Sequence, residues 1–494
     1  MRTWGILAVC LAATLAMGLA WFWRVPLMGD DGAYAFRTAS WISENGLVPY
    51  AAGPGRGEQA MGHPILFFWL WAALIRLFGN TLAVARILPT IATTLALAGT
   101  WKLAETLSRD RLAGAVATLG LLATPVFATQ MFRPLPDVAF VAVSAWATLF
   151  FFRNRLLPAL LLTCLAAALK EQGALLAVVF LAGDIVGARR FRPGMLLWLC
   201  PLLVTGITLL SNLLVNGYVV YRSHFTLETS SVALPHNWFR YWLGYFGGGL
   251  LGWNYRWIPV SVALAVVLSA RRERLSLPVI AALLSPALFL DSHTFVYTLL
   301  VGALALLAVA YRGGLRGRIE TVSLLMPAAP VVFLLALVPF TAGSNHDLLR
   351  YLLGAFPLLM ALLVSRLLSA GRGIALPVWG AFVAASLSTF GRVCPGAWQF
   401  EDSPVGLAAS VAFREAVAAS ENPFTQRDGI LEEPALGFVD SPRPFREGAP
   451  GEFVLFDPIE LEGLPEGYAL TGDTVYEWRH RGLSVLSLGM VPSY

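Results

Sequence analysis

Long apolar segments alternate with short polar loops along the first 390 residues of the chain. Most of them are about 16–25 residues long, the length that an α-helix needs to cross a bilayer. The pattern predicts transmembrane spans over residues 4–23, 82–107, 112–130, 136–152, 156–170, 172–188, 195–220, 247–269, 276–291, 295–310, 321–341, 350–368 and 374–390. We therefore expect an all-α polytopic membrane protein with about thirteen transmembrane helices.

Two of the apolar segments permit a second interpretation. The apolar segment 63–79 is short for a transmembrane span and contains Arg76. It therefore predicts either a span or an amphipathic helix lying on the membrane surface. The first segment, Trp4 to Trp23, follows Arg2 and resembles a secretory signal peptide in length. No convincing small-x-small cleavage site precedes the polar loop, and aromatic residues end the segment, which favours an uncleaved span with an interfacial belt.

Composition supports a membrane protein. Hydrophobic residues make up 57% of the 494 residues and charged residues 13%, whereas soluble domains carry about 25% charged residues. The net charge of +5 is unevenly distributed along the chain. Residues 1–390 hold 28 basic and 14 acidic side chains, whereas residues 391–494 hold 7 basic and 16 acidic side chains. The basic charge belongs to the membrane part and reports topology, so it does not indicate nucleic-acid binding.

Short arginine clusters occupy alternate loops, which predicts the orientation of the chain. The positive-inside rule places these loops in the cytoplasm, with the amino terminus inside and the carboxyl terminus outside the cell membrane. All six histidines and most of the mixed acidic and basic residues then fall on the opposite, outer side, where we expect a functional site. The arginines are Arg109/Arg111, Arg153/Arg155, Arg189/Arg190/Arg192, Arg271/Arg272/Arg274, Arg312/Arg316/Arg318 and Arg366/Arg372.

The last 104 residues, 391–494, have a different character. Ser403-Pro404 predicts an N-cap followed by proline in the first turn of a helix that runs to about Ser420. Residues 421–450 are rich in Pro, Gly and charge and indicate a loop, and short strands are predicted at 452–456, 474–478 and 483–488. We expect a small soluble α+β domain on the extracytoplasmic face, following a membrane domain over 1–390.

Adjacent carboxylates, Asp30 and Asp31, stand in the predicted outer loop 24–81, where the first span ends. Neighbouring carboxylates raise one another's pKa, which suits a general base near neutral pH. The same pair is also suited to capping a helix or binding a divalent cation, and the dipeptide alone does not separate these roles. No spaced ligand motif accompanies it, so we expect no required metal or other cofactor.

Other candidates follow along the same face, and each has a structural alternative. The histidine before Pro64 suits substrate contact or interfacial packing, and the aspartate at the start of the fourth span suits substrate contact or an N-cap. The arginine and tyrosine that open the span at 350–368 suit substrate contact or interfacial anchoring. The candidates are His63, Arg133, Asp137, Lys170, Arg350 and Tyr351.

Taken together, these motifs resemble a known family. The pattern comprises Asp30-Asp31-x-x-Tyr34, Gly62-His63-Pro64, Arg133-Pro-Leu-Pro-Asp137, Leu169-Lys170-Glu171-Gln172-Gly173 and Arg350-Tyr351-Leu352-Leu353. It is similar to that of the polyprenyl-phosphate-sugar-dependent glycosyltransferases of the GT-C fold. Within that fold, the protein O-mannosyltransferase and aminoarabinose lipid A transferase branch, glycosyltransferase family 39, is nearest. The resemblance covers about residues 20–190 and 340–370.

The resemblance implies a role for each matching residue. Asp30 takes the position of the catalytic aspartate and Asp31 that of its neighbouring glutamate. The remaining candidates take substrate-binding positions. Where the chain departs from the family pattern (Asp31 for Glu, Ile65 for a second proline, and Glu171-Gln172 inserted before the expected glycine), the identity of donor and acceptor is open.

The implied reaction moves a sugar from a polyprenyl-phosphate donor to a hydroxyl of a lipid, glycan or protein acceptor on the extracytoplasmic (periplasmic) face. Asp30 would accept the acceptor's proton, and single displacement would invert the anomeric centre. Lys170, Arg133 and Arg350 would offset the charge of the leaving phosphate. The alternatives are a ligase or a transporter or flippase for polyprenyl-linked envelope glycans, and a scaffold whose tail binds a partner. Few ionisable residues lie near span centres, which counts against a transporter.

Overall fold

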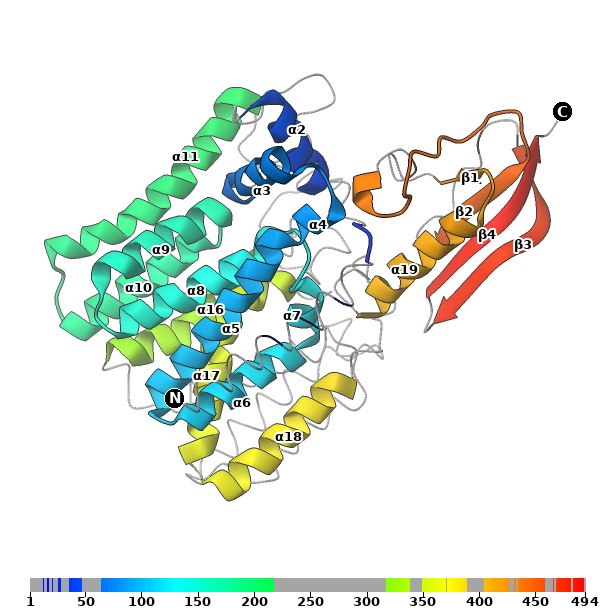
Figure 1. Ribbon diagram of the computed structural model, residues 1–494. Helices are drawn as coiled ribbons and strands as arrows, with labels where there is room; N and C mark the ends of the chain where they lie inside the picture. The colour runs from blue at the N-terminus through cyan, green and yellow to red at the C-terminus, as the bar shows by residue number, and fades with distance from the viewer. Residues whose placement is uncertain are drawn as a thin grey trace, which may run out of the picture.

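The computed structural model describes residues 25–27, 35–46, 64–216, 317–337, 349–369, 371–388, 404–425, 434–457, 468–480 and 483–492, with a few single residues besides. In this part of the chain a bundle of helices carries a small β-sheet at one end (Figure 1). The predicted spans at 247–269, 276–291 and 295–310 lie outside the described residues, as do most of the first span and residues 28–34.

The predicted spans that the structure describes are helical, with bounds close to those expected. The helices of the amino-terminal half are α2 (Arg37–Asn45), α3 (Leu66–Phe78), α4 (Leu82–Ala85), α5 (Ile87–Ser108), α6 (Arg111–Ala123), α7 (Pro125–Gln130), α8 (Pro136–Phe152), α9 (Leu156–Leu169), α10 (Gly173–Ala188) and α11 (Leu199–Asn216). Those that follow are α16 (Arg318–Leu337), α17 (Phe356–Ser369) and α18 (Arg372–Ser388).

Four predicted spans are interrupted or change their winding. The span expected at 82–107 is divided at Arg86 into α4 and α5. The span expected at 112–130 is divided into α6 and α7, because Pro125 has no N–H to continue the helix and forces Thr124 into an extended conformation. The 3₁₀-helix η2 (Pro193–Trp198) precedes α11, and the 3₁₀-helix η9 (Leu349–Ala355) precedes α17. The ambiguous segment 63–79 forms α3, a helix of 13 residues.

Within the described residues, three helices are both long and apolar enough to cross a membrane: Leu82–Ser108, Pro193–Ser211 and Leu352–Ser369. Shorter apolar helices of 10–17 residues lie beside them, among them Pro136–Phe152 and Gly173–Ala188. A 17-residue helix is about 26 Å long, somewhat less than the hydrocarbon core of about 30 Å. The structure thus confirms a mostly helical membrane protein with a small sheet; the number of spans stays a prediction.

Small residues allow the helices of the bundle to pack closely. α5 and α8 are in contact along their lengths, and a Cβ added to Gly99 of α5 would lie 2.8 Å from the Cβ of Ala145. Larger side chains fill the space further out, where Phe151 stacks on Phe180 with ring centroids 4.4 Å apart. Close packing of this kind stabilises helix association in a membrane, where lipid removes the hydrophobic driving force between helices.

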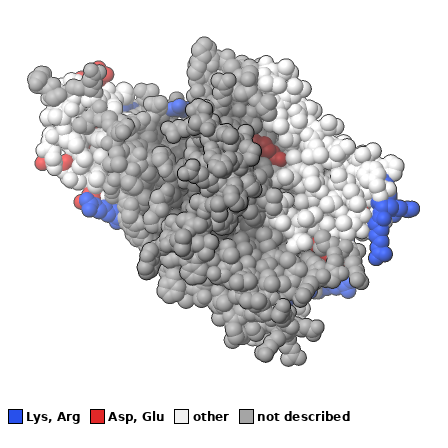
Figure 2. Space-filling model, turned by 180° about the vertical axis from the view of Figure 1, so that it is seen from behind, with Lys and Arg blue, Asp and Glu red and all other residues white. Residues whose placement is uncertain are grey.

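Arginine-bearing loops gather at one end of the bundle, which we call the arginine end. Arg372 at the start of α18 pairs with Asp110 at the start of α6 (3.0 Å), and Arg318 at the start of α16 pairs with Asp184 near the end of α10 (2.8 Å). Arg153 after α8 donates to the Thr106 hydroxyl in the last turns of α5 (3.2 Å). Figure 2 shows basic side chains at the edge of the molecule away from the small sheet, and others on the side that carries it. The arginine loops named here thus lie at one end of the bundle, and the orientation of the chain in the membrane stays a prediction.

The carboxyl-terminal region forms a helix and a four-stranded sheet. Helix α19 (Pro404–Ala419) and strands β1 (Pro423–Phe424), β2 (Gly451–Asp457), β3 (Tyr468–His480) and β4 (Leu483–Pro492) contain the helix and strands that the sequence predicts. The strand order is β1-β2-β4-β3, with β1 parallel to β2 and the other pairs antiparallel. α19 packs on the sheet and contacts α7, so this region lies at the end of the bundle opposite the arginine end (Figure 1).

Candidate functional site

The structure brings several of the predicted site residues to the end of the bundle that carries the sheet, which we call the sheet end. Arg133 lies in the turn between α7 and α8, Asp137 in the first turn of α8 and Lys170 at the end of α9. Arg350 and Tyr351 lie in η9, which contacts α7 and α8. Asp30, Asp31 and His63 lie outside the described residues, so their roles stay predictions.

Asp137 and Lys170 form a buried ion pair between α8 and α9. The Lys170 ammonium contacts a carboxylate oxygen of Asp137, and their side chains are 6% and 4% exposed. The N-cap of α8 is Leu135, so the alternative role of Asp137 as N-cap is wrong. Its carboxylate still stands in the first turn, where the helix dipole favours negative charge. A buried pair of this kind costs desolvation energy and is weak evidence for stability alone.

A tight turn holds Lys170 in place. Lys170 ends α9 in an extended conformation, and its carbonyl accepts a hydrogen bond from Gly173 N–H (2.9 Å) as α10 begins. A Cβ on Gly173 would lie 2.1 Å from the backbone nitrogen of Ala167, so only glycine allows α10 to start this close to α9. Gly173, the last residue of the Leu169–Gly173 motif, is thus required by the turn that carries Lys170.

The turn that bears Arg133 is anchored to α5 by side chains. Buried Arg86, at the start of α5, donates to the carbonyls of Phe132 (2.6 Å) and Val25 (2.5 Å). Thr93, two turns further along α5, donates from its hydroxyl to the carbonyl of Met131. The Arg133 side chain is only 2% exposed. Buried guanidinium groups need hydrogen-bonding partners, and the arrangement fixes this turn beside the chain at Val25.

Arg350 belongs to a segment that packs directly on the same helices. The arginine is half-buried, and Gly354 of the same 3₁₀-helix lies against the ring of Phe140 in α8. Arg350 therefore enters the sheet end from a part of the chain more than 170 residues after Lys170.

The carboxyl-terminal region contacts the segment that precedes Asp30 in the sequence. Leu27 N–H donates to the carbonyl of Leu436 (2.8 Å), and both side chains are buried. Gly437 has a φ of 84°, and a Cβ there would meet Leu82 of α4 at 2.8 Å. Leu27 and Leu436 belong to one apolar cluster with Leu135 and Leu169, the neighbours of the candidate residues. The tail is thus part of the sheet end.

Positive charge exceeds negative charge around the Asp137–Lys170 pair, although the described part of the tail is net acidic. Around the pair, Arg86, Arg133, Lys170 and Arg350 stand against Asp137 and Glu171, a difference of two charges. Such an excess in a water-poor setting suits an anionic ligand, and phosphate is the group that arginine and lysine bind most readily. In the described part of the chain, no three potential metal ligands come together.

Sequence reasoning assigned no role to Arg86 or Gln172. Gln172 stands inside the Leu169–Gly173 motif quoted above, and Arg86 stands in the stretch Ala85-Arg86-Ile87-Leu88-Pro89. The signal that was available is a lone polar residue next to an apolar run, which predicts a buried and partnered or functional side chain in a membrane protein. The carbonyls that Arg86 binds, those of Phe132 and Val25, lie far away in the sequence, so only the fold identifies them.

Comparison with known proteins gives a family match in sequence and remote likenesses in structure. Residues 62–215 match the family model "Dolichyl-phosphate-mannose-protein mannosyltransferase". No curated protein matches the chain in sequence.

Two solved structures of ArnT from Cupriavidus metallidurans, one bound to undecaprenyl phosphate and one in the apo state, cover 98% of this chain and 97% of theirs. Their identities are 13% and 15% and both TM-scores are 0.42, a level at which the likeness carries no functional inference.

The family match spans the helices from α3 to α11 and includes His63, Arg133, Asp137 and Lys170. These are the residues on which the resemblance was based in this half of the chain. The match indicates a glycosyltransferase, and over residues 62–215 it confirms the predicted resemblance to the protein mannosyltransferases of the GT-C fold.

Proposed function

We propose that this protein transfers a sugar from a polyprenyl-phosphate donor to a hydroxyl acceptor at the sheet end, on the extracytoplasmic face of the cell membrane, with inversion at the anomeric carbon. The observation that carries the proposal is the buried group of Arg133, Asp137 and Lys170 within the segment that matches a family of lipid-phosphate-sugar transferases. The name of that family includes dolichyl phosphate mannose, a sugar carried on a polyprenyl phosphate.

The cations of the sheet end would bind the phosphate of the donor. Arg133 is fixed by its turn and Arg350 by the packing of η9 on α8, so both charges are held in place before the donor binds. Preorganised cations stabilise negative charge that develops on a leaving phosphate, because they need no reorganisation during the reaction. Lys170 would act mainly through Asp137, which directs its ammonium group.

Asp30 would accept the proton of the attacking hydroxyl, and Asp31 would support it. The described residues nearest to them in sequence support this placement. The Arg86 guanidinium donates hydrogen bonds to the carbonyl of Val25 and to that of Phe132, directly before Arg133. The backbone N–H of Leu27 donates to the carbonyl of Leu436 in the tail. His63 directly precedes Pro64, which is buried. The acceptor, the sugar and the length of the polyprenol are left open.

Replacement of Asp30 by asparagine tests the proposal. We expect Asp30→Asn to lower transfer of labelled mannose or aminoarabinose from polyprenyl phosphate by about 10²–10⁴-fold, the contribution typical of a general base. Glu58→Gln, at another acid of the predicted loop 24–81, is the matched control and should leave the rate within about twofold.

Near wild-type transfer by a folded Asp30→Asn variant would refute the assignment of the base. A protein that shows no transfer from either donor, yet moves polyprenyl-linked glycans across proteoliposomes, would instead be a flippase.

A further inference from the structure

The arginine end of the bundle divides into two halves that differ in charge balance. In the half built by α5, α6 and α18, acidic side chains offset the basic ones. Lys102 lies 2.7 Å and Arg111 4.0 Å from carboxylate oxygens of Glu105. Arg372 lies 3.0 Å from a carboxylate oxygen of Asp110. The other half joins the ends of α8 and α10 to the starts of α9 and η2. Its exposed arginines, which we call the arginine cluster, are Arg153, Arg155, Arg189, Arg190 and Arg192.

Among the described residues, no carboxylate forms an ion pair with the arginine cluster. Asp184, the acid of α10, is held instead by the indole of Trp198 (2.6 Å) and by Arg318 (2.8 Å). Arg153 donates to the hydroxyl of Thr106, which carries no charge. The positive charge of the cluster is therefore not balanced within the described part of the chain, and an anion is the partner that complements it.

Large apolar side chains are exposed beside the same arginines. Phe191 stands between Arg190 and Arg192 and is 56% exposed, and Leu157, two residues after Arg155, is 65% exposed. The helices α9 and α11 pack side by side (Figure 1). Further exposed leucines follow along α9, η2 and α11: Leu161, Leu196, Leu197, Leu199 and Leu203. Cationic and apolar groups thus share one surface, as on proteins that bind amphiphiles.

The helix that follows the cluster favours a lipid over a soluble anion. Pro193–Ser211 is apolar enough to cross a membrane, and only 22% of its apolar window is buried. A soluble anion would neutralise the arginines and leave Phe191 and Leu157 uncovered. A lipid with an anionic headgroup contacts both kinds of side chain, because its charge and its acyl chains belong to one molecule.

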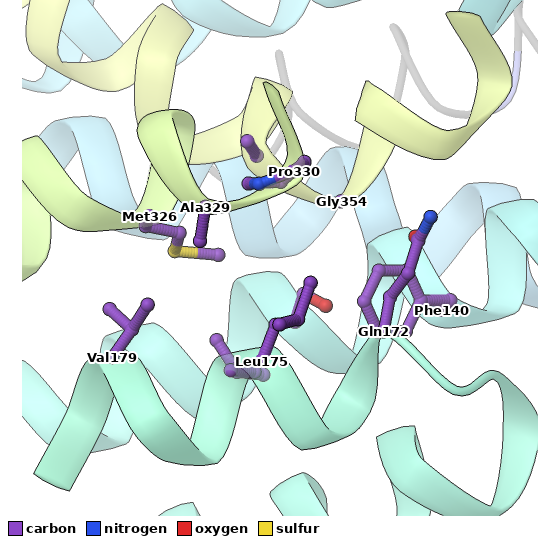
Figure 3. A pocket seen from close by; sticks show the side chains of 11 residues that line it. Phe140, Gln172, Leu175, Val179, Met326, Ala329, Pro330 and Gly354 are labelled. Atoms are coloured by element: carbon purple, nitrogen blue, oxygen red, sulfur yellow. The ribbon is translucent and has the colours of Figure 1, made fainter. Parts of the chain in front are cut away.

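A hollow elsewhere in the bundle offers no comparable site. It lies between α8, α10, α16 and η9, with Phe140 and Gln172 at one end and Val179 and Met326 towards the other (Figure 3). It has room for about one water molecule, and no charged side chain lines it among the described residues. Neither a phosphate nor an acyl chain therefore fits there, which leaves the surface of the arginine cluster as the place for an anionic lipid.

We propose that the arginine cluster and the exposed leucines of α9 and α11 bind an anionic diacyl phospholipid. The guanidinium groups of Arg189, Arg190 and Arg192 hydrogen-bond to its phosphate, because the planar fork of arginine matches phosphate oxygens. The acyl chains lie along Leu157 and Leu203. Phosphatidylcholine offers the same phosphate, but its choline cation is repelled by the cluster. This site lies at the end of the bundle opposite the sheet end, and it does not depend on the proposed transfer reaction.

The test compares two lipids that differ only in the headgroup. Purified full-length protein in detergent is titrated with dioleoylphosphatidylglycerol or with dioleoylphosphatidylcholine, and bound lipid is measured by native mass spectrometry. We expect the phosphatidylglycerol to bind at least about fivefold more tightly, the factor that one charge near a basic surface gives. Equal binding of the two lipids by the wild-type protein would overturn the proposal.

Two double variants then locate the site. Arg190→Gln/Arg192→Gln removes two charges of the cluster and should abolish most of the preference for phosphatidylglycerol. Arg111→Gln/Arg372→Gln is the matched control, since it removes two exposed arginines from the other half of the same end and should keep the preference. An equal loss in both variants would indicate a general attraction to the arginine end and would overturn the proposal.

A competition experiment separates a lipid from a soluble anion. Inorganic phosphate and glycerophosphoglycerol, the headgroup without acyl chains, are added to the complex of wild-type protein and phosphatidylglycerol at the same ionic strength as a chloride control. We expect neither to displace the lipid at concentrations up to tenfold above it. Displacement by either compound would assign the cluster to a soluble anion instead.

Discussion

The arginine end and the sheet end use charge in different ways. At the arginine end the pairs are exposed or half-exposed: Arg372 is 66% exposed in its pair with Asp110, and Arg318 is 21% exposed in its pair with Asp184. At the sheet end the Asp137–Lys170 pair is almost completely buried, and Arg86 and Arg133 are 3% and 2% exposed. Exposure at the arginine end thus ranges from the exposed Arg372 to the partly buried Arg318–Asp184 pair, whereas these charges of the sheet end are inside the protein.

This difference separates topology from function. Exposed arginines in short loops orient the chain in the membrane without needing fixed partners, and each pair adds about 0–1 kcal/mol to stability. Buried charges cost several kcal/mol each in desolvation, so their retention points to a use beyond folding. The arginine end thus bears on the predicted orientation of the chain, and the sheet end is where chemistry is expected.

The largest effect is expected when the buried pair is broken. Lys170→Met leaves the Asp137 carboxylate buried without its cation and should lower the free energy of unfolding by about 3–5 kcal/mol, measured by thermal or denaturant unfolding in detergent. The double variant Lys170→Met/Asp137→Leu removes both charges and should recover most of this loss. If the double variant also recovered full transfer activity, the pair would be structural and the contrast between the two ends would fail.

A smaller effect is expected at the contact between the tail and the segment before Asp30. Gly437→Ala forces a side chain into a left-handed conformation and towards Leu82, which should cost about 1–2 kcal/mol and loosen the tail, as seen by faster proteolysis after α19. Gly472→Ala is the matched control, since Gly472 has a φ of 87° and open space around it. Equal proteolysis of both variants would show that the Leu82 contact does not hold the tail.

The smallest effect is expected at the arginine end. The backbone N–H of Leu112, and then Arg372, hold the pKa of Asp110 below its usual value against the opposing effect of burial. A lowered pKa in the folded state contributes stability above the unfolded pKa of about 4, and this stability is lost as the pH falls through the folded value.

Arg372→Gln should lower stability at pH 7 by no more than about 1 kcal/mol, with a smaller difference from wild type at pH 3. A loss comparable to that of Lys170→Met would contradict the distinction between the two ends.

Much of the helical layout follows from local pattern. Residues 136–152 and 172–188 are predicted within one residue of α8 and α10, because a span-length apolar run between polar loops has few other structures open to it. The prediction for 112–130 is wrong in one respect, since Pro125 divides the helix although hydropathy continues across it. Hydropathy averages over a window and does not register the loss of one backbone donor.

The candidate site could be predicted only in part. Asp137 and Lys170 were chosen from spacing within motifs, yet their direct pairing across 33 residues is a property of how α8 packs on α9. Arg86 and Gln172 received no role, because the carbonyls that Arg86 binds and the hollow that Gln172 lines are assembled from distant segments. Asp30 and Asp31, on which the proposed chemistry rests, stay predictions from the sequence.

The sequence by itself determined the apolar, mostly helical character of the chain, the alternation of its apolar segments with polar loops and its resemblance to a family over residues 62–215, because these depend on composition, period and short motifs that each stretch of chain carries alone. The tertiary structure decided which charges are buried, which of them meet, and that the tail is bonded to the segment preceding Asp30. Those properties depend on contacts between residues as far apart as Leu27 and Leu436, and such contacts exist only once the helices have packed.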